Sequence, residues 1–162
     1  VVPDIVLMAK GMGGGIPIGA FAASNQLMRQ LSFNPLLGHI TTFGGNALAC
    51  AAAAASLEVI LEPGFMQQIP RKEEIIRELL VHPEILTIHG KGLLLAAEMR
   101  DNALVLRTME CCYANGLITD WFLFADNCLR IAPPLTISEE EIKKACSIIL
   151  LSIEQALESL KN

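Results

Sequence analysis

The sequence predicts an α/β protein with two regions, and three observations along its 162 residues support that prediction. An apolar run at residues 4–9 ends at one lysine and four glycines, as a buried strand does where it reaches a loop. An alanine-rich helix is expected at residues 47–61. From residue 84 onward, short strands alternate with helices of 3.6-residue period, which is typical of a small α+β layer.

The first region is expected to lead from a strand through a loop to the alanine-rich helix. In order, its elements are a strand at 4–9 buried on both faces, a glycine-rich loop at 11–17, a second strand at 18–23, a short helix at 25–31 and a turn-rich loop up to Asn46. Asn46 is a good N-cap for the helix at 47–61, which Pro63 and Gly64 end. The many alanines of this helix imply that another backbone packs closely against it.

The second region is expected to alternate between helices and strands. A helix at 65–81 that Pro70 kinks or splits precedes this region. From residue 84 the region contains two strands joined by a tight turn within 84–99, a helix at 102–115 ended by Gly116, two strands at 117–124 and 128–132 joined by a turn at Asp126–Asn127, and a final helix. Ser138 and Glu141 form a capping box for the final helix. Its 3.6-residue period predicts one buried face made of Ile142, Ala145, Ile149, Ile153, Ala156, Leu157 and Leu160.

The composition argues against several classes of function. A net charge of −5, a pI near 5.2 and the lack of a basic patch argue against a nucleic-acid partner. Five cysteines without a CxxC pair argue against a metal site, and reduced thiols are typical of a cytoplasmic protein. The apolar run at residues 47–57 has 11 residues, too few to cross a bilayer, so no membrane partner is expected.

The chain is nevertheless unusually apolar, with 52% hydrophobic residues, 18% charged residues and a mean hydropathy of +0.47. We expect the excess to form a surface that contacts a partner subunit or a part of the protein outside this chain. The sequence opens directly on the apolar segment "VVPDIVLM", which favours the second explanation.

Lys10 lies where the first strand is expected to end, and ligands of α/β sheets bind at this edge. The glycines after Lys10 leave room for a flat ligand. Two phosphate-binding patterns fail, because a P-loop places its lysine after the glycines and because Ile16 breaks GxGxxG. We expect the stem of Lys10 to be partly buried, which favours an uncharged amine that attacks carbonyl groups. The alternative is a solvated lysine at a strand end.

Two further positions are candidates for binding anions. Thr41 and Thr42 lie in "HITTFGGN", just before a helix start, where hydroxyl and free N–H groups suit a phosphate. The alternative there is an ordinary capped loop. Arg130 lies on a mostly apolar strand, where its guanidinium can receive a carboxylate in a bidentate manner. The alternative for Arg130 is a structural ion pair with one of the glutamates.

Four segments in this order resemble the class III pyridoxal-phosphate aminotransferases, and the ornithine and acetylornithine branch in particular. They are "PDIVLMAKGMGGGIPIGA", "HITTFGGNALACAAA", "HGKGLLLAAEM" and "LRIAPPLTISEEEI", and together they extend over nearly the whole chain. The resemblance implies a fold type I transferase and a ping-pong transamination in which an amino acid passes its amine to a 2-oxo acid such as 2-oxoglutarate.

The resemblance also implies roles for single residues. Lys10 matches the lysine that forms the internal Schiff base with pyridoxal 5′-phosphate and then acts as general base and acid. Thr42 matches the threonine that binds the cofactor phosphate in the neighbouring subunit of a homodimer, and Thr41 is the weaker candidate. Arg130 matches the arginine that pairs with a substrate carboxylate.

Family members are much longer, and this sequence resembles only their C-terminal part. The resemblance implies that residues 1–62 end the large cofactor domain and that residues 63–162 form the small α+β domain. The aspartate on the pyridine nitrogen, the phosphate loop and the stacking aromatic residue are then expected outside this chain, as in a fragment, a truncated gene product or a proteolysed remnant. The alternatives are a non-catalytic module that docks a partner through its apolar surface and, less favoured, a phosphate-binding hydrolase.

Overall fold

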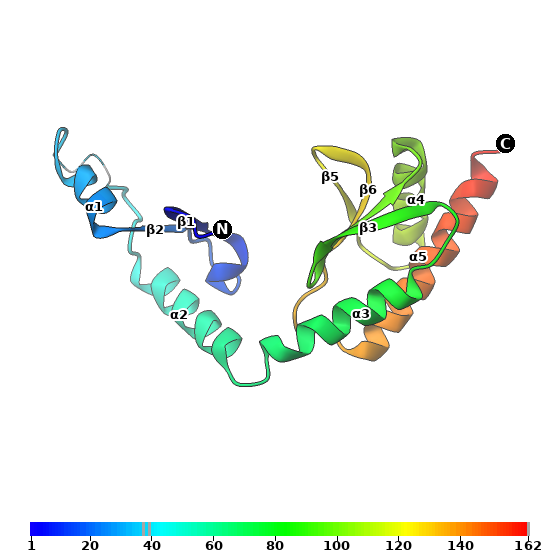
Figure 1. Cartoon of the computed structure of the whole chain (residues 1–162), viewed down its shortest axis with the longest axis horizontal. Coiled ribbons are helices and arrows are strands. Elements are labelled where there is room, and N and C mark those ends of the chain that lie inside the picture. The colour runs from blue at the N-terminus through cyan, green and yellow to red at the C-terminus, as the bar shows by residue number, and fades with distance from the viewer. Residues whose placement is uncertain (37, 39, 162) are drawn as a thin grey trace. The chain divides into compact units, whose positions relative to one another are not determined.

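The structure is a computed structural model that describes residues 1–36, 38 and 40–161 of the chain. It divides into two compact units, Val1–Met66 and Gln67–Asn162, and each unit is described by itself (Figure 1). His39, the first residue of the threonine–glycine segment, lies outside the described residues.

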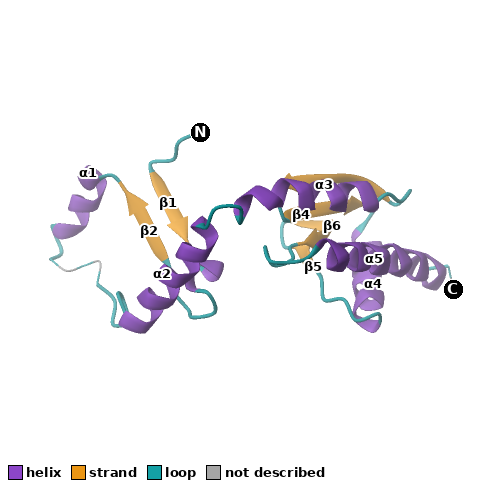
Figure 2. Ribbon diagram, turned by 90° about the horizontal axis from the view of Figure 1, so that it is seen from below, coloured by secondary structure: helices purple, strands orange, loops and turns teal. Residues whose placement is uncertain are grey.

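The first unit contains a strand hairpin and one long helix. Its elements are β1 (Ile5–Met8), the 3₁₀ helix η1 (Lys10–Gly13), β2 (Ala20–Ala23), α1 (Asn25–Met28), the 3₁₀ helix η2 (Arg29–Ser32) and α2 (Ala47–Leu61). The two strands pair antiparallel, with Ile5 opposite Ala23 (Figure 2). The predicted N-cap is confirmed, because the Asn46 side chain accepts a hydrogen bond from the Ala49 amide at 3.1 Å.

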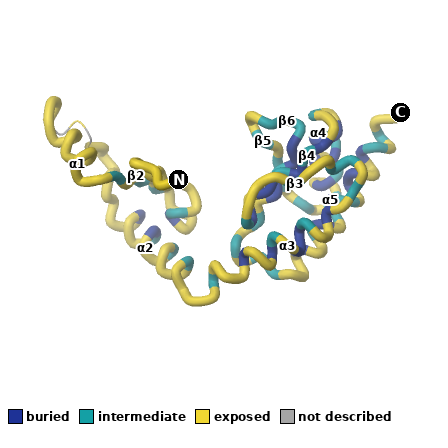
Figure 3. Tube along the Cα trace, viewed as in Figure 1, coloured by how far each residue is buried: buried dark blue, intermediate teal, exposed yellow. Residues whose placement is uncertain are grey.

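The expectation that the first strand is buried on both faces is wrong. Every residue of β1 is exposed, and Figure 3 shows most of the first unit as exposed. The reason is structural: β2 is the only strand paired with β1 among the described residues, and even the better covered face leaves Val6 42% and Met8 39% exposed. The apolar side chains of this strand therefore face outward instead of forming a core.

The second unit is an antiparallel sheet packed against helices. Its elements are the 3₁₀ helix η3 (Met66–Gln68, which straddles the boundary), α3 (Ile69–Leu79), β3 (Ile85–Lys91), β4 (Leu94–Met99), α4 (Asn102–Ala114), β5 (Asp120–Phe122), β6 (Ala125–Ile131) and α5 (Glu139–Ser159). The strand order is β3-β4-β6-β5. Pro70 lies in the first turn of α3, so the predicted split of the helix at 65–81 is confirmed.

One face of this sheet forms the core of the second unit. Along β4, Leu95, Ala97 and Met99 are buried, whereas the residues between them are less covered. The core is completed by side chains from the strands and the three helices, including Ile76, Leu104, Val105, Leu129, Ile142, Ile149 and Ile153. Ala96 pairs with both His89 and Arg130, and Arg130 also pairs with Asp120, so these residues share the opposite face of the sheet.

The last hairpin differs from the prediction. Its turn is at Leu123–Phe124, which are 77% and 97% exposed, and not at Asp126–Asn127. Asp126 and Asn127 belong to β6, where the Asn127 side chain donates a hydrogen bond to the Met99 carbonyl at 3.4 Å. These side-chain and backbone contacts to neighbouring elements replace the local turn that their residue types favour.

The final helix follows the prediction except at its end. The capping box of Ser138 and Glu141 is present, and Ile142, Ile149, Ile153 and Ala156 are buried. Leu160, expected on the buried face, is 45% exposed because it lies just past the last helical residue. No single helix of the described residues is long and apolar enough to span a membrane; α2 and the segment Met66–Leu79 meet that test only when taken together.

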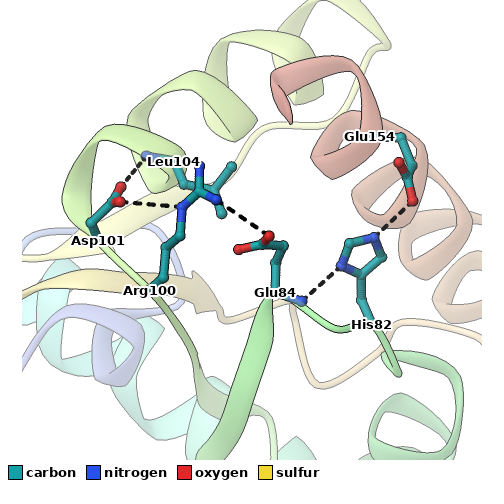
Figure 4. A network of polar contacts seen from close by, with 6 residues as sticks. All are labelled: His82, Glu84, Arg100, Asp101, Leu104 and Glu154. Atoms are coloured by element: carbon teal, nitrogen blue, oxygen red, sulfur yellow. Dashed lines mark hydrogen bonds and ion pairs between the residues drawn. The ribbon is translucent and has the colours of Figure 1, made fainter. Parts of the chain in front are cut away.

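A polar network ties the start of β3 to two helices (Figure 4). His82 contacts Glu154 of α5 at 2.9 Å and accepts a hydrogen bond from the Glu84 amide at 3.1 Å. Arg100 lies between Glu84 and Asp101, and Asp101 is the N-cap of α4. The network therefore fixes the loop before β3 against α4 and α5.

Candidate functional site

Lys10 follows β1 and begins the 3₁₀ helix η1, as expected for a residue at the strand end. Its backbone has φ 54°, and it is the one non-glycine residue with positive φ that the described part of the chain contains. This left-handed conformation costs a lysine roughly 1–2 kcal/mol. Residues held in such conformations often belong to functional sites.

The side chain of Lys10 is exposed, so the expectation of a partly buried stem is wrong. The reason is that Lys10 lies in η1 between two strands whose own residues are mostly exposed. Within residues 1–36, 38 and 40–161, the Lys10 amine has no hydrogen bond and no ion pair. The amine is therefore available to a ligand.

The glycine loop after Lys10 is seated on α2. A Cβ at Gly14, which has φ 57°, would lie 3.3 Å from Ser56 Cβ and 3.6 Å from the Ala52 carbonyl oxygen. Glycine at this position thus permits a close approach of the loop to α2. This agrees with the expectation that the alanine-rich helix packs closely against another part of the backbone. A Cβ at Gly11 or Gly15 would meet nothing within 4 Å, so the loop is open beside Lys10.

Thr41 and Thr42 are exposed in the turn before α2. The Thr41 carbonyl accepts a hydrogen bond from the Gly44 amide at 3.2 Å, and Gly45 has φ 70°. The helix is capped by Asn46, so neither threonine hydroxyl serves as the N-cap of α2. The loop is therefore a capped loop in which the Thr41 hydroxyl lies against Gly44, where a Cβ would be 2.6 Å from Thr41 Oγ1.

Arg130 lies on β6 directly opposite Asp120 of β5. Its Nη2 forms an ion pair with Asp120 Oδ2 at 2.5 Å, and the two side chains are 41% and 42% exposed. The Thr119 hydroxyl donates a hydrogen bond to the Arg130 carbonyl at 2.6 Å. The alternative of a structural ion pair is thus realised in part, with an aspartate in place of the expected glutamate.

Two hollows of the second unit meet at Arg130. One has a volume of about 620 Å³ and is mainly apolar, with Asp120, Thr119 and Tyr113 as polar residues of its lining beside Arg130. The other has a volume of about 520 Å³, and its lining consists of Arg130 with His89, Ala96, Phe122, Leu123, Phe124, Ala125 and Cys128. Arg130 therefore contributes to both, whereas Asp120 contributes to the first alone.

Three buried thiols of the second unit are not activated for chemistry. Burial raises the pKa of the Cys146 thiol to about 11, and burial also raises the pKa of the Cys112 thiol. Cys128 likewise has a pKa raised by burial. At neutral pH these groups are protonated and serve as packing. The described residues contain no cluster of three or more His, Cys, Asp and Glu side chains that could hold a metal ion.

The structure places the predicted residues in different units. Lys10, Thr41 and Thr42 lie in the first unit and Arg130 in the second, and no hydrogen bond between described residues joins Lys10 to either threonine. Sequence reasoning missed Asp120 as the partner of Arg130. The available signal was the pair of short strands at 117–124 and 128–132, which must place acidic and basic residues opposite each other in some register.

Comparison with known proteins identifies the family. The sequence model of the family described as aminotransferase class-III matches residues 1–153. The chain belongs to this family. An acetylornithine aminotransferase from Caldanaerobacter subterraneus subsp. tengcongensis is 40% identical in an alignment 157 positions long, and the alignment covers 92% of this chain and 37% of that protein. The chain thus spans little more than a third of the length of this relative.

Solved structures of aminotransferases have the same fold. An ornithine aminotransferase from Toxoplasma gondii, with partial occupancy of pyridoxal phosphate at its active site, matches with a TM-score of 0.85 and 30% identity. The match covers 100% of this chain and 39% of that one. A Bacillus anthracis aminotransferase matches with a TM-score of 0.84 and 30% identity, over 96% and 39% of the two chains. The predicted α/β fold of the C-terminal part of such an enzyme is confirmed.

Proposed function

We propose that this chain is the lysine-bearing and C-terminal part of an enzyme that transfers an amino group from an amino acid to a 2-oxo acid such as 2-oxoglutarate. The names of its relatives support ornithine or acetylornithine as the donor, and the proposal extends this to the ω-amino-acid type in general. The observation that carries the proposal is Lys10, an exposed lysine with a left-handed backbone at the end of β1 and beside an open glycine loop.

Pyridoxal 5′-phosphate fits the surroundings of Lys10. The amine is exposed and the loop is open at Gly11 and Gly15, so an aldehyde has access to Nζ. When bound, the cofactor supplies a ring that takes up the electrons of the bond broken at the substrate carbon. Thr42, with Thr41 as the weaker candidate, would hold the phosphate in the neighbouring subunit of a homodimer.

In this proposal Lys10 and Arg130 have separate tasks. Lys10 Nζ accepts the proton from the amine-bearing carbon of the donor and returns a proton when the 2-oxo acid is aminated. The Arg130 guanidinium binds a substrate carboxylate and so determines which carbon lies at the reacting position.

We also propose the domain boundary and the location that the sequence suggested. Residues 1–62 would be the end of the large domain and residues 63–162 the small domain, and the division of the structure after Met66 supports a boundary in this part of the chain. Free thiols at all five cysteines support a cytoplasmic protein.

Covalent labelling of Lys10 tests the proposal. The chain is joined to the N-terminal part of the Caldanaerobacter acetylornithine aminotransferase, mixed with pyridoxal phosphate and reduced with borohydride. Peptide mass spectrometry is expected to find the pyridoxyl group on Lys10, and Lys10→Arg should abolish it. For the 162-residue chain alone we expect weak labelling or none, because residues that grip the cofactor are expected outside it.

Lys91→Arg is the matched control, since Lys91 is also exposed but lies on β3. This variant should keep the label. If the fused protein carries no label on Lys10, or labels Lys10 and Lys91 equally, the cofactor assignment is wrong.

A second candidate function is a non-catalytic module that docks a partner through its apolar surface. The exposure of Leu7 on β1 and of Leu48 and Leu57 on α2 favours this reading. Size-exclusion chromatography with light scattering separates the two candidates. A stable monomer that does not bind pyridoxal phosphate supports the non-catalytic module. A chain that is always associated with other copies supports the aminotransferase.

A further inference from the structure

The carboxylate of Asp120 is held in place from two sides. Its Oδ1 accepts a hydrogen bond from the Trp121 amide at 2.9 Å, and its Oδ2 contacts Arg130 Nη2 at 2.5 Å. The two residues are directly opposite in neighbouring strands, so the backbone register sets their separation. Asp120 is therefore a fixed negative charge beside the guanidinium.

Arg130 retains donors that this ion pair does not use. A guanidinium has five N–H donors, and the contact with Asp120 engages Nη2 alone. The remaining donors are available on a side chain that is 41% exposed and that also lines the 520 Å³ hollow. The carboxylate of a ligand can thus reach Arg130, but Arg130 is already paired with Asp120 when the ligand arrives.

Among the described acidic groups of the second unit, Asp120 is the one that forms an ion pair with Arg130. His89 contacts Glu98 at 2.8 Å, and Glu98 also accepts a hydrogen bond from the Asn127 amide at 3.4 Å. Glu98 therefore has partners of its own and makes no ion pair with Arg130. Removal of its charge provides a test of general charge effects on the same sheet face.

We propose that Asp120 is a specificity-determining residue of the Arg130 site, and that its fixed charge lowers the affinity of this site for substrate carboxylates. This proposal rests on the proposed function, in which Arg130 receives the carboxylate. The Asp120 carboxylate and a ligand carboxylate that contact the same guanidinium repel each other. Because the site is only partly exposed, solvent screens this repulsion only in part. The ligand carboxylate shares or replaces the contact with Asp120, and product leaves more readily than it would from an unpaired arginine.

The test measures binding of 2-oxoglutarate to the 162-residue chain without cofactor, by NMR titration of the Arg130 side-chain N–H signal. Asp120→Asn, which removes the charge and keeps the shape, is expected to tighten binding about three- to tenfold, the Coulomb effect of a unit charge roughly 6 Å away. Asp120→Ser provides a second neutral side chain if the asparagine variant does not fold. In the wild-type chain, the Asp120 carboxyl ¹³C signal should move as the ligand saturates.

Two control variants make the outcome decisive. Glu98→Gln removes a charge from the same sheet face and should change affinity less than twofold. Arg130→Gln should abolish binding; if it does not, the carboxylate role of Arg130 fails too. Unchanged or weaker binding in the neutral Asp120 variants, an equal gain in Glu98→Gln, or an unmoved Asp120 signal overturns the proposal. Because no cofactor is present, these results are independent of labelling at Lys10.

Discussion

Thr108 is fully buried in α4, and its hydroxyl is without a hydrogen-bond partner among the described residues. A buried hydroxyl without a partner lowers stability by about 1–3 kcal/mol relative to a shape-matched apolar group. Thr108→Val keeps the β-branched shape, so we expect the free energy of unfolding to rise by about 1 kcal/mol. Urea denaturation followed by circular dichroism measures the change.

Thr108→Ser is the matched control, because it keeps the hydroxyl and removes the methyl group. We expect this variant to be less stable than the wild type by about 1 kcal/mol. If valine were destabilising, the hydroxyl would have a partner in solution that the structure does not contain.

Single residues also show how far the sequence can predict a site. The position of Lys10 at a strand end follows from the apolar run before it, but its left-handed backbone does not, because positive φ is expected at glycine. Its exposure was likewise missed, since burial depends on which elements cover a strand. The pairing of Arg130 with Asp120 depends on strand register, which local patterns leave open.

At the scale of elements, α3 is fastened to the edge strand β3 by a pair of charged residues. Arg77 donates hydrogen bonds to the Ile88 carbonyl at 2.6 Å and to the Gly90 carbonyl at 2.9 Å. Glu73 contacts Arg77 at 2.9 Å and accepts a hydrogen bond from the Gly92 amide at 2.6 Å. The β3–β4 turn is therefore held to the helix through both side chains.

These contacts make stability depend on acidity. The Gly92 amide, and then Arg77, lower the pKa of Glu73 from its ordinary value of 4.5. Since the folded-state pKa lies below the unfolded one, the stabilisation is complete above about pH 4.5 and is lost as the pH falls through the folded-state pKa. We expect Glu73→Gln to flatten this part of the stability profile, as measured by urea midpoints between pH 7 and pH 3.

Glu74→Gln is the control for this profile, because Glu74 pairs with Arg71 on the exposed side of α3. Its profile should follow that of the wild type below pH 4.5 more closely than Glu73→Gln does. An identical acid response in all three proteins would show that Glu73 is not the group that titrates with unfolding.

Elements with local signals were predicted well. The cap at Asn46, the capping box of Ser138 and the break at Pro70 all depend on neighbours within four residues. The misplaced turn near Asp126 has the opposite cause: Asn102 and Met99, far along the chain, bond to Asp126 and Asn127 and hold them in a strand. Tertiary contacts of this kind override local turn preference.

At the scale of the whole molecule, the two units differ in how much they bury. The second unit contains the hydrophobic core, whereas β1 and much of α2 are exposed. Local stability follows buried apolar contact, so we expect backbone amides of the sheet and helices in Gln67–Asn162 to exchange hydrogen at least tenfold more slowly than those of Val1–Met66. Hydrogen exchange read by mass spectrometry gives the comparison.

Concentration is the control for that experiment. If protection in Val1–Met66 rises as the protein is concentrated, association of copies covers the exposed apolar residues. Strong protection of this unit at the lowest concentration would contradict the expectation.

The chain carries a single tryptophan, and its place gives the carboxylate site a built-in optical signal. Trp121 is part of β5, and its amide donates to the same Asp120 carboxylate that contacts Arg130. Any ligand that shifts this carboxylate perturbs the backbone that bears the indole. Tryptophan fluorescence can therefore follow the binding of a ligand at Arg130 in the unlabelled protein, because no other tryptophan contributes to the signal.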